Sequence, residues 1–383
     1  MKRIISFLLI ACLVLSLVPS ALADTVIKPN EKRKIKLQKV QENQAEEGIS
    51  PTTGLPLDEL ENVEGFAGLA VTGRYMPMLV QIDNTDGGVD KRAPWGASYA
   101  DIVYETPLYK AGNTRLSYLF SDLIPDSVGP VRSARLGHVW LREEWDAGFL
   151  FYGYQEFAKA DCKAELKKWD VEKKGLAFSG TVGTGKAWKK YYTRRKGVAS
   201  PHNVDANVSA MYDLIPADFV PRNHTFLFTD AIPEGELADE VRINTGHDAY
   251  SSALIYDVDT NLYYRYMGVG DDLTPYEDKD TTEHIGFANV IIQFAEVQWP
   301  RTDAPITFHV GQKYYNKKGS YEVGGNADFF MGGVRVKGYW QRKSMEDRTV
   351  FYTADGKELE LQRGKTLIVV VDSKLWEVSY TAY

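Results

Sequence analysis

Val128-Gly129-Pro130-Val131-Arg132-Ser133-Ala134-Arg135 is the stretch around which the first half of the sequence is organised. Its Gly-Pro pair predicts a turn, and apolar residues at near-helical spacing between Ser133 and Trp145 predict a helix that Ser133 caps. Arg132 and Arg135 then lie at the positive end of that helix, where guanidinium groups and the helix dipole together favour an anion. The alternative is that both arginines pair with buried carboxylates of the fold. The sequence leaves these two interpretations open.

The length and charge of the chain set the first limits on its class. Its 383 residues are enough for two domains, and 44% hydrophobic with 25% charged residues is typical of globular proteins. The formal net charge of −7 argues against non-specific nucleic-acid binding, because an acidic protein is repelled by the phosphate backbone. We therefore expect a folded protein with no nucleic-acid partner.

Residues 1–23 have the three regions of a secretory signal peptide. Lys2 and Arg3 precede an apolar run, and Ala21-Leu22-Ala23 supplies small residues for cleavage after Ala23. A second interpretation is that Cys12 is lipidated, because Leu9-Ile10-Ala11-Cys12 is similar to a lipoprotein motif. After cleavage only Cys162 remains, which excludes an intramolecular disulfide, and no later segment is long and apolar enough to cross a membrane. We expect a secreted or otherwise extracytoplasmic protein.

Shifts in composition divide the rest of the chain. Residues 24–50 are polar and rich in lysine, glutamate and glutamine, so we expect a linker. Strand and helix signals interleave over 51–230, which predicts a mixed α/β domain with helices covering a sheet. Strand signals dominate 246–383, which predicts a smaller, mainly antiparallel β-rich domain. The predicted fold class is α+β.

Hydrophobic patterning identifies the main elements of the first domain. Alternating or continuous apolar runs predict strands at 76–83, 100–105, 114–120 and 148–152. Near-helical spacing predicts helices at 133–145, 156–169 and 204–214.

Two apparent ligand-binding motifs each lack an essential residue. Residues 180–187 have the glycine and lysine spacing of a phosphate-binding loop, but Ala187 stands where a hydroxyl residue must hold magnesium. Residues 257–261 are similar to the start of a calcium loop, but Leu262 replaces the glycine of its turn, so we expect a hairpin turn instead. The six histidines show no zinc-ligand spacing. We therefore expect neither a cofactor nor a metal.

Charged and polar residues lie where the predicted strands end or begin, which is where α/β folds place ligands. The candidate ligand-binding residues are Arg132, Arg135, Ser133, Arg115, Asp83, Asn84, Asp101, Glu105, His202 and Asn203. His202 is also a candidate general acid or base, and Asn203 a candidate oxyanion donor, although Asn203 is equally a natural helix cap. None of these residues is assigned a catalytic role by the sequence.

Several short motifs occur in the order found in the YerB-like family of exported bacterial proteins. They are Thr53-Gly54-Leu55-Pro56, Ile82-Asp83-Asn84, Ala100-Asp101-Ile102-Val103-Tyr104-Glu105, Gly129-Pro130-Val131-Arg132-Ser133-Ala134-Arg135, Pro201-His202-Asn203 and, in the second half, Gly338-Tyr339-Trp340. The chain departs from the family pattern at Ala93-Pro94-Trp95 and Tyr152-Gly153-Tyr154. The resemblance implies a two-domain, envelope-associated protein with domains of unknown function. Members are commonly lipoproteins, and the family brings no established reaction.

These observations lead to three hypotheses about function. The first is an extracytoplasmic binding protein that holds an anionic or glycan ligand, such as cell-wall glycan, in a cleft of arginines and carboxylates. The second is an enzyme acting on cell-wall glycan or lipid-linked phosphate, in which Asp101 and Glu105 would form a glycosidase pair or the arginines would neutralise developing charge. The third is a structural module whose strand-rich half, residues 246–383, binds an envelope protein.

Overall fold

The computed structural model describes residues 24–383 except 34, 36–37, 62, 85–93, 158–159, 182–187, 223, 300–306, 311 and 314–322. The expected signal segment 1–23, with Cys12 and the cleavage site after Ala23, lies outside the described residues. Most of the glycine loop at 180–187 lies outside them as well.

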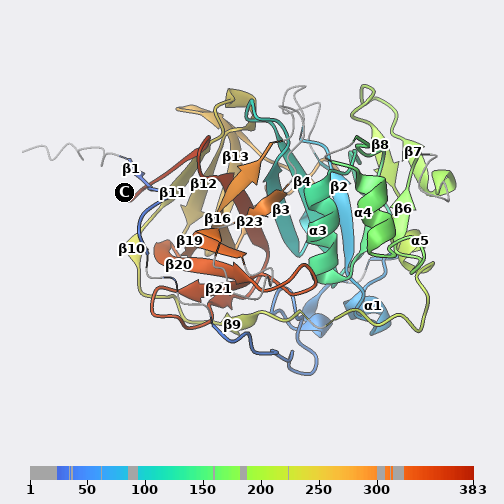
Figure 1. Ribbon diagram of the computed structural model, residues 1–383, viewed down its shortest axis with the longest axis horizontal. Helices are drawn as coiled ribbons and strands as arrows, with labels where there is room; N and C mark the ends of the chain where they lie inside the picture. The colour runs from blue at the N-terminus through green and yellow to red at the C-terminus, as the bar shows by residue number, and fades with distance from the viewer. Residues whose placement is uncertain are drawn as a thin grey trace, which may run out of the picture.

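One large mixed sheet runs through both halves of the chain (Figure 1). Its strands in spatial order are β10 (Glu236–Leu237), β20 (Val334–Arg342), β19 (Val323–Met331), β16 (Asn289–Gln298), β23 (Thr366–Asp372), β3 (Ile102–Pro107), β4 (Thr114–Phe120), β2 (Met78–Ile82), β5 (Gly148–Phe151) and β6 (Ala177–Ser179). In addition, β17 (Thr307–Val310) pairs with β16, β18 (Gln312–Lys313) with β19 and β21 (Val350–Thr353) with β20. β16, β23 and β3 are parallel neighbours, as are β2, β5 and β6, and β4 runs antiparallel between β3 and β2. The carboxyl ends of these six parallel strands therefore lie along one edge of the sheet.

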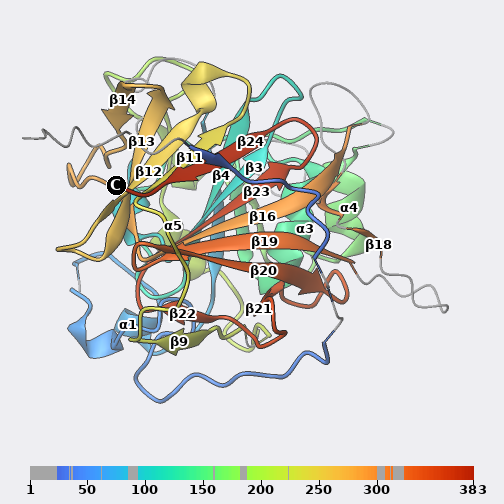
Figure 2. The ribbon, with the colours of Figure 1, turned by 90° about the vertical axis from the view of Figure 1, so that its left-hand side faces the viewer.

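A second, antiparallel sheet packs on the large one. It contains β1 (Thr25–Val26), β24 (Glu377–Thr381), β11 (Glu240–Asn244), β12 (Ser252–Asp257), β13 (Leu262–Val269), β14 (Asp272–Pro275) and β15 (Gly286–Phe287). Figure 2 shows this sheet beside the strands β16, β23 and β3. The ring of Tyr263 on β13 meets Phe330 on β19 edge to face at 6.4 Å, and one hydrophobic core includes residues from both sheets. The two predicted parts of the chain thus share a core.

The predicted α+β class is wrong, because the described residues form a mostly β protein. Their α-helices are short: α1 (Leu69–Thr72), α3 (Leu136–Trp145), α4 (Cys162–Lys168) and α5 (Val208–Tyr212). 3-10 turns occupy Leu57–Glu59, Ala97–Tyr99, Lys189–Tyr191 and Asp248–Tyr250. α3 and α4 lie side by side against only part of the large sheet (Figure 1), while the second sheet packs elsewhere on it. A face that we expected helices to cover is therefore largely covered by strands.

The helix predicted at 204–214 was too long because its first residues pair as a strand. The predicted helix 204–214 begins as β8 (Val204–Ala206), which pairs with β7 (Tyr192–Arg194), and only then turns into α5 after the cap Asn207. A tertiary strand partner outweighs local helical spacing there. The hairpin turn expected at 257–261 is confirmed, since it joins the paired strands β12 and β13.

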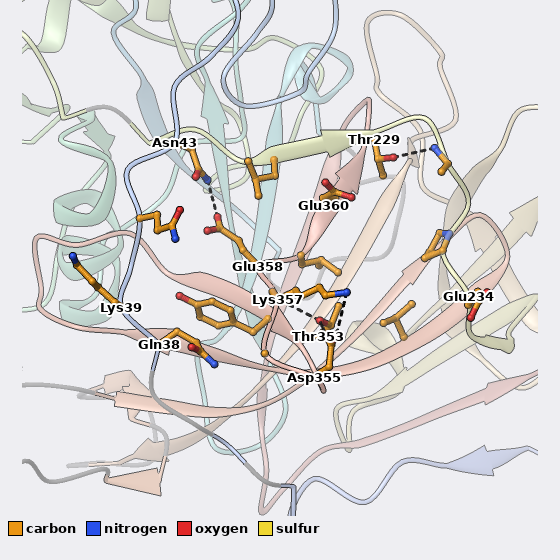
Figure 3. Close-up of a pocket in the computed structure, with 18 residues that line it drawn as sticks. Gln38, Lys39, Asn43, Thr229, Glu234, Thr353, Asp355, Lys357, Glu358 and Glu360 are labelled. Carbon is orange, nitrogen blue, oxygen red and sulfur yellow. Dashed lines mark hydrogen bonds and ion pairs between the residues drawn. The ribbon is translucent and has the colours of Figure 1, made fainter.

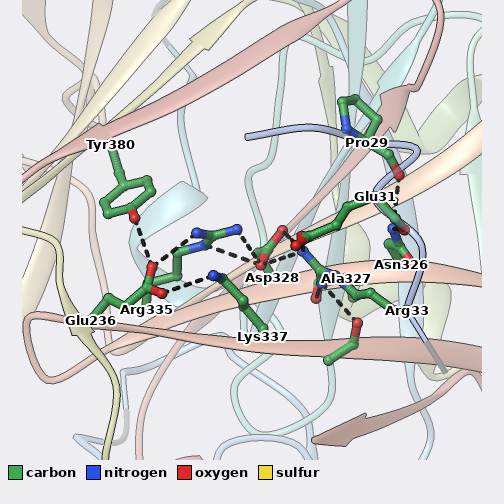
Figure 4. Close-up of polar contacts among 11 residues, drawn as sticks. Pro29, Glu31, Arg33, Glu236, Asn326, Ala327, Asp328, Arg335, Lys337 and Tyr380 are labelled. Carbon is green, nitrogen blue, oxygen red and sulfur yellow. Dashed lines mark hydrogen bonds and ion pairs between the residues drawn. The ribbon is translucent and has the colours of Figure 1, made fainter. Parts of the chain in front are cut away.

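The N-terminal segment 24–50, which the sequence marks as a linker, is held against the strand-rich half; we call it the N-terminal strap. β1 pairs with β24, and Arg33 donates to the carbonyl oxygens of Ala327 and Gly338 at 2.7 and 2.9 Å. Figure 4 shows Arg33 and Arg335 reaching Asp328 from opposite sides. Asp328 is fully buried and lies 3.1 Å from Arg33 and 2.9 Å from Arg335. Two guanidinium groups thus compensate one buried carboxylate and anchor the strap.

β9 (Leu227–Thr229) and β22 (Glu360–Gln362) form a short separate parallel pair just before β23 begins. In the described part of the chain, no helix is long and apolar enough to cross a membrane.

Candidate functional site

The sequence-predicted site residues gather mainly at the carboxyl edge of the large sheet. Asp83 and Asn84 directly follow β2, Glu105 lies near the end of β3, and Arg115 lies near the start of the antiparallel β4. Because β2 and β3 are both antiparallel to β4, these positions meet at the same edge. This edge is where open α/β sheets bind ligands.

Asp83 is the centre of a charged group that we call the Asp83 centre: Asp83, Arg115, Arg132 and His202. Nδ1 of His202 lies 2.6 Å from Oδ2 of Asp83, Nε of Arg132 lies 3.1 Å from the same oxygen, and Nη1 of Arg115 lies 3.5 Å from Oδ1. The Asp83 side chain is fully buried, whereas 27% of the Arg132 side chain and 15% of the His202 side chain are exposed. The group therefore reaches solvent through Arg132 and His202.

Among the described residues, Arg115 is influenced by one carboxylate, that of Asp83, and by two further cations. Burial lowers the pKa of Arg115 to about 10, the Asp83 carboxylate opposes this, and the nearby cations Arg135 and Arg132 lower it further. Nη1 of Arg115 and Nε of Arg132 face Asp83, whereas Nε of Arg115 and Nε of Arg135 are buried with no hydrogen-bond acceptor among the described residues. Two guanidinium groups thus face the Asp83 carboxylate, and a third, that of Arg135, lies close enough to act on Arg115.

Glu105 has a different cation from the ones the sequence suggested. Its Oε2 accepts a 2.6 Å hydrogen bond from Arg265 on β13, and both side chains are almost completely buried. Its Oε1 accepts from Thr114 at 2.7 Å and from Asn84 at 3.4 Å. The guanidinium of Arg265 also lies 4.7 Å from the centre of the Tyr276 ring. This pair joins the two sheets next to the Asp83 centre.

Arg135 and Ser133 have local roles at the start of α3. The N-cap is Arg135 and not Ser133, and the Arg135 backbone N–H donates to Nδ1 of His138 at 3.0 Å. The Arg135 guanidinium donates to the Ala134 carbonyl at 3.1 Å, and burial lowers its pKa. The Ser133 hydroxyl donates to the carbonyl oxygen of Tyr152 at 3.1 Å. The expected Ser133 cap is therefore wrong, because that hydroxyl is directed to the end of β5.

Asp101 lies away from the Asp83 centre, before β3 begins. Its Oδ2 accepts from the Ser121 backbone N–H at 2.6 Å, the Ser121 hydroxyl at 2.7 Å and the Asp122 N–H at 3.1 Å. Asp122 in turn accepts from the hydroxyls of Ser50 and Thr53, both at 2.8 Å. We call these residues, with Thr52, the hydroxyl cluster. Burial and the neighbouring carboxylate of Asp122 raise the pKa of Asp101.

Asn203 follows His202 in a turn before β8, so the helix that Asn203 was expected to cap is absent there. Its side-chain oxygen accepts from Arg194 at 2.7 Å. Arg195, which follows Arg194 in the sequence, stacks over the Trp95 ring at 4.5 Å and pairs with Asp280. The structure therefore brings His202 to Asp83 but directs Asn203 to Arg194.

Arg265 is the residue of this region that the sequence reading missed. It occupies an inward position of β13, where Tyr263, Arg265 and Met267 are buried in alternation. A charged residue in phase with buried apolar residues was the available signal, because such a residue needs a partner inside the fold. Within the described residues, no group of three or more His, Cys, Asp or Glu side chains is close enough to hold a metal ion.

Comparisons with known proteins find the same relatives for sequence and fold. Residues 66–218 match the family model described as "Protein of unknown function (DUF3048) N-terminal domain", and residues 241–368 match the corresponding C-terminal domain. A Bacillus subtilis protein named "Putative lipoprotein YerB" is 25% identical over 331 residues, which cover 84% of this chain and 86% of the relative. The crystal structure of YerB from Bacillus subtilis covers 86% of this chain and 99% of its own, with 23% identity and a TM-score of 0.60. The family resemblance seen in the sequence is confirmed.

Proposed function

The chain belongs to the YerB-like family, whose two domains are of unknown function, and from this premise we propose that it is an envelope-associated protein that binds an anionic ligand at the Asp83 centre. The name of the Bacillus relative supports an extracytoplasmic address, either secreted after cleavage at Ala23 or lipid-anchored at Cys12. The ligand is a phosphate- or carboxylate-bearing part of a cell-envelope polymer.

The observation that carries the proposal is the excess of guanidinium groups over carboxylates among the described residues around Arg115. Arg115, Arg132 and Arg135 act on one another electrostatically, and Asp83 is the carboxylate that acts on Arg115. An incoming phosphate or carboxylate compensates this surplus and accepts hydrogen bonds from N–H groups that lack acceptors. Buried donors of this kind are costly unless a partner is supplied.

Arg115 and Arg132 have different roles: Arg115 stabilises the fold, and Arg132 contacts the ligand. Arg115 is 1% exposed and faces Asp83, so it compensates the buried charge. Arg132 is 27% exposed and can turn toward solvent while His202 continues to hold Asp83. Arg132 is therefore the residue that meets the ligand first.

The test is calorimetric titration of the protein with a glycerol phosphate trimer and, separately, with muramyl dipeptide. These two probes distinguish a phosphate ligand from a carboxylate ligand. Arg132→Gln should weaken binding of the preferred probe at least about tenfold, because a hydrogen bond to a charged group is lost. Arg242→Gln is the matched control, since Arg242 is 28% exposed and pairs with Glu240 in the other sheet.

Equal affinity of wild type and Arg132→Gln, or no binding of either probe, would contradict the proposal. Equal weakening by Arg132→Gln and Arg242→Gln would instead indicate a general effect of surface charge.

The short contact between Asp83 and His202 favours one enzymatic alternative. A carboxylate on Nδ1 orients an imidazole so that its Nε2 can transfer a proton, as in acid–base catalysis. The matching reaction is hydrolysis of a lipid-linked phosphate, with Arg132 neutralising the developing charge. Phosphate release from a polyprenyl phosphate should then require His202, be lost in His202→Gln and survive in His247→Gln. Release that is absent, or equal in both variants, would rule this out.

The geometry does not favour Asp101 and Glu105 as a glycosidase pair. Asp101 precedes β3 and Glu105 lies near its end, so about 13 Å of extended strand separate the two residues. Glycosidase carboxylates lie roughly 5 to 10 Å apart. Each carboxylate also has its own partners, the hydroxyl cluster for Asp101 and Arg265 for Glu105.

A further inference from the structure

A cavity of about 740 Å³ lies near the amino ends of the central strands, at the opposite edge from the Asp83 centre (Figure 3). Three separate segments and Val336 of β20 line it: residues 38–43 of the N-terminal strap, 227–234 around β9, and 352–360 from β21 to the start of β22. β22 directly precedes β23, so the cavity lies where the parallel strands begin. Its volume is within the roughly 300 to 1,000 Å³ of small-molecule sites. We call it the strap cavity.

Acceptor groups dominate the rim of the strap cavity. Figure 3 shows Glu234 and Glu358 on opposite sides of it, with Glu360 above and Asp355 below. The carboxylates of Glu234 and Glu360 have no ion-pair or hydrogen-bond partner among the residues that the structure describes. Asp355 is neutralised by Lys357 at 3.4 Å. The cavity therefore offers free acceptors to a ligand that donates hydrogen bonds.

Two polar groups in the wall are held in place before any ligand arrives. Oε1 of Glu358 accepts from Asn43 of the strap and from Arg348, both at 2.7 Å. Tyr352 is 3% exposed, and its hydroxyl has no hydrogen-bond partner in the described part of the chain. Burial, and secondarily Glu358, raises the pKa of Tyr352 to about 12, so its hydroxyl is a permanent donor at neutral pH. Fixed groups lower the ordering cost of binding.

The chemistry of the lining excludes other ligand classes. Because Asp355 pairs with Lys357 and Glu358 with Arg348, the remaining carboxylates of Glu234 and Glu360 outnumber the one remaining lysine, Lys39, of the lining, which disfavours a phosphate or another anion. The carboxylates are too dispersed to share one metal ion, since no metal-binding group of three exists in the described part of the chain. Leu227, Val336 and Leu359 add apolar patches between the polar groups. A ligand with many hydroxyl donors and apolar C–H faces fits such a wall.

We propose that the strap cavity is a binding site for a neutral oligosaccharide, whose hydroxyl groups donate to Glu234 and Glu360 and accept from Tyr352. The strap supplies one wall, so the site exists only while residues 38–43 are docked. This inference does not rest on the anion-binding function of the Asp83 centre, because the two sites lie at opposite edges of the sheet and share no residue.

The test is calorimetric titration of the protein with chitotetraose, a neutral oligomer of N-acetylglucosamine. We expect saturable binding of one oligomer per chain. Glu360→Gln removes a charge-assisted acceptor and Tyr352→Phe removes one hydroxyl while keeping the ring, so each should weaken binding at least about tenfold. Glu377→Gln, an exposed carboxylate on β24, is the matched control and should bind as wild type does.

Any of four outcomes would overturn the proposal. One is an absence of binding heat with both chitotetraose and cellotetraose. Another is unchanged affinity in Glu360→Gln and Tyr352→Phe. The third is tighter binding of the cationic, deacetylated tetramer that weakens with salt, which identifies a cation site instead. The fourth is loss of chitotetraose binding in Arg132→Gln while Glu360→Gln and Tyr352→Phe still bind, which would place the saccharide at the Asp83 centre.

Discussion

The Asp83 centre and the hydroxyl cluster hold buried carboxylates at opposite ends of the same strands, by different means. Asp83 follows the end of β2 and lies among Arg115, Arg132 and His202. Asp101 precedes β3 and Asp122 follows β4, and they accept hydrogen bonds from hydroxyl and backbone N–H groups. Burial raises the pKa of both Asp101 and Asp122. One end of the sheet surrounds its carboxylate with cationic side chains, whereas at the other end burial raises the pKa of both carboxyl groups.

Because of this difference, the Asp83 centre can take up a ligand from solvent, whereas the hydroxyl cluster is inaccessible to one. Cations around Asp83 reach solvent and carry spare donors, so a second anion can join them. The hydroxyl cluster ties residues 50–53 to the start of the first domain and is buried throughout. We therefore assign ligand binding to the first and structural docking to the second.

Asp83→Asn should have the largest effect on stability. The change leaves the nearly inaccessible guanidinium of Arg115 without its carboxylate, and breaking a buried ion pair in this way costs about 3 to 5 kcal/mol. Urea unfolding of wild type and variant measures the difference. Asp280→Asn is the control, because Asp280 is 41% exposed and its pair with Arg195 is worth about 0 to 1 kcal/mol. A loss below that of the control would mean that Asp83 is not needed to compensate Arg115.

Asp101→Asn should increase the free energy of unfolding at neutral and higher pH, whereas Asp83→Asn lowers it. The folded pKa of Asp101 is raised, so its stabilising protonation is complete below the unfolded pKa of about 3.9 and is lost as pH rises through the folded pKa. Asparagine avoids that loss, and its carbonyl oxygen can replace Oδ2, the oxygen that accepts from Ser121 and the Asp122 N–H. We expect the variant to equal wild type at pH 4 and to exceed it by on the order of 1 kcal/mol at pH 8.

Unfolding free energies measured across this pH range provide the check. A variant that is less stable than wild type at pH 8 would show that Asp101 is needed as a charged group. The hydroxyl cluster would then resemble the Asp83 centre.

Arg132→Gln should have the smallest effect on stability. Its side chain is 27% exposed and Asp83 keeps Arg115 and His202, so the unfolding free energy should change by about 1 kcal/mol or less. Arg115→Gln, at 1% exposure, should cost several times more. Equal losses, measured by urea unfolding, would remove the distinction between a ligand-facing and a structural arginine.

Local sequence patterns predicted the strands better than the helices. The strand predicted at 114–120 coincides with β4, and that at 76–83 contains β2. The helix predicted at 133–145 begins only at Leu136, since the Arg132 and Ala134 backbones pair with β2 and the end of β5. An apolar run that is buried on both faces is stable as a central strand of a sheet, so its structure can be predicted from its composition. A short segment with helical spacing can instead pair as a strand when a neighbouring strand is available.

For the candidate site, the sequence identified Asp83, Arg115, Arg132 and His202 but not their arrangement. His202 is 119 residues from Asp83, and Arg265 is 160 residues from Glu105. Nothing in the local sequence pattern distinguishes Asp83, which forms ion pairs with arginines, from Asp101, which accepts hydrogen bonds from hydroxyl and backbone N–H groups.

The sequence by itself determined the family, the positions of the central strands and the polar residues at their ends, because these follow from short motifs and from alternation along the chain. Tertiary structure alone decided that a second sheet covers much of the large one, that the strap closes a cavity, and which carboxylate meets a cation. The physical reason is that the charge state of a buried carboxylate depends on what distant segments bring within a few ångströms of it. Two aspartates that look alike in the sequence therefore differ because one end of the sheet gathers guanidinium groups and the other gathers hydroxyls.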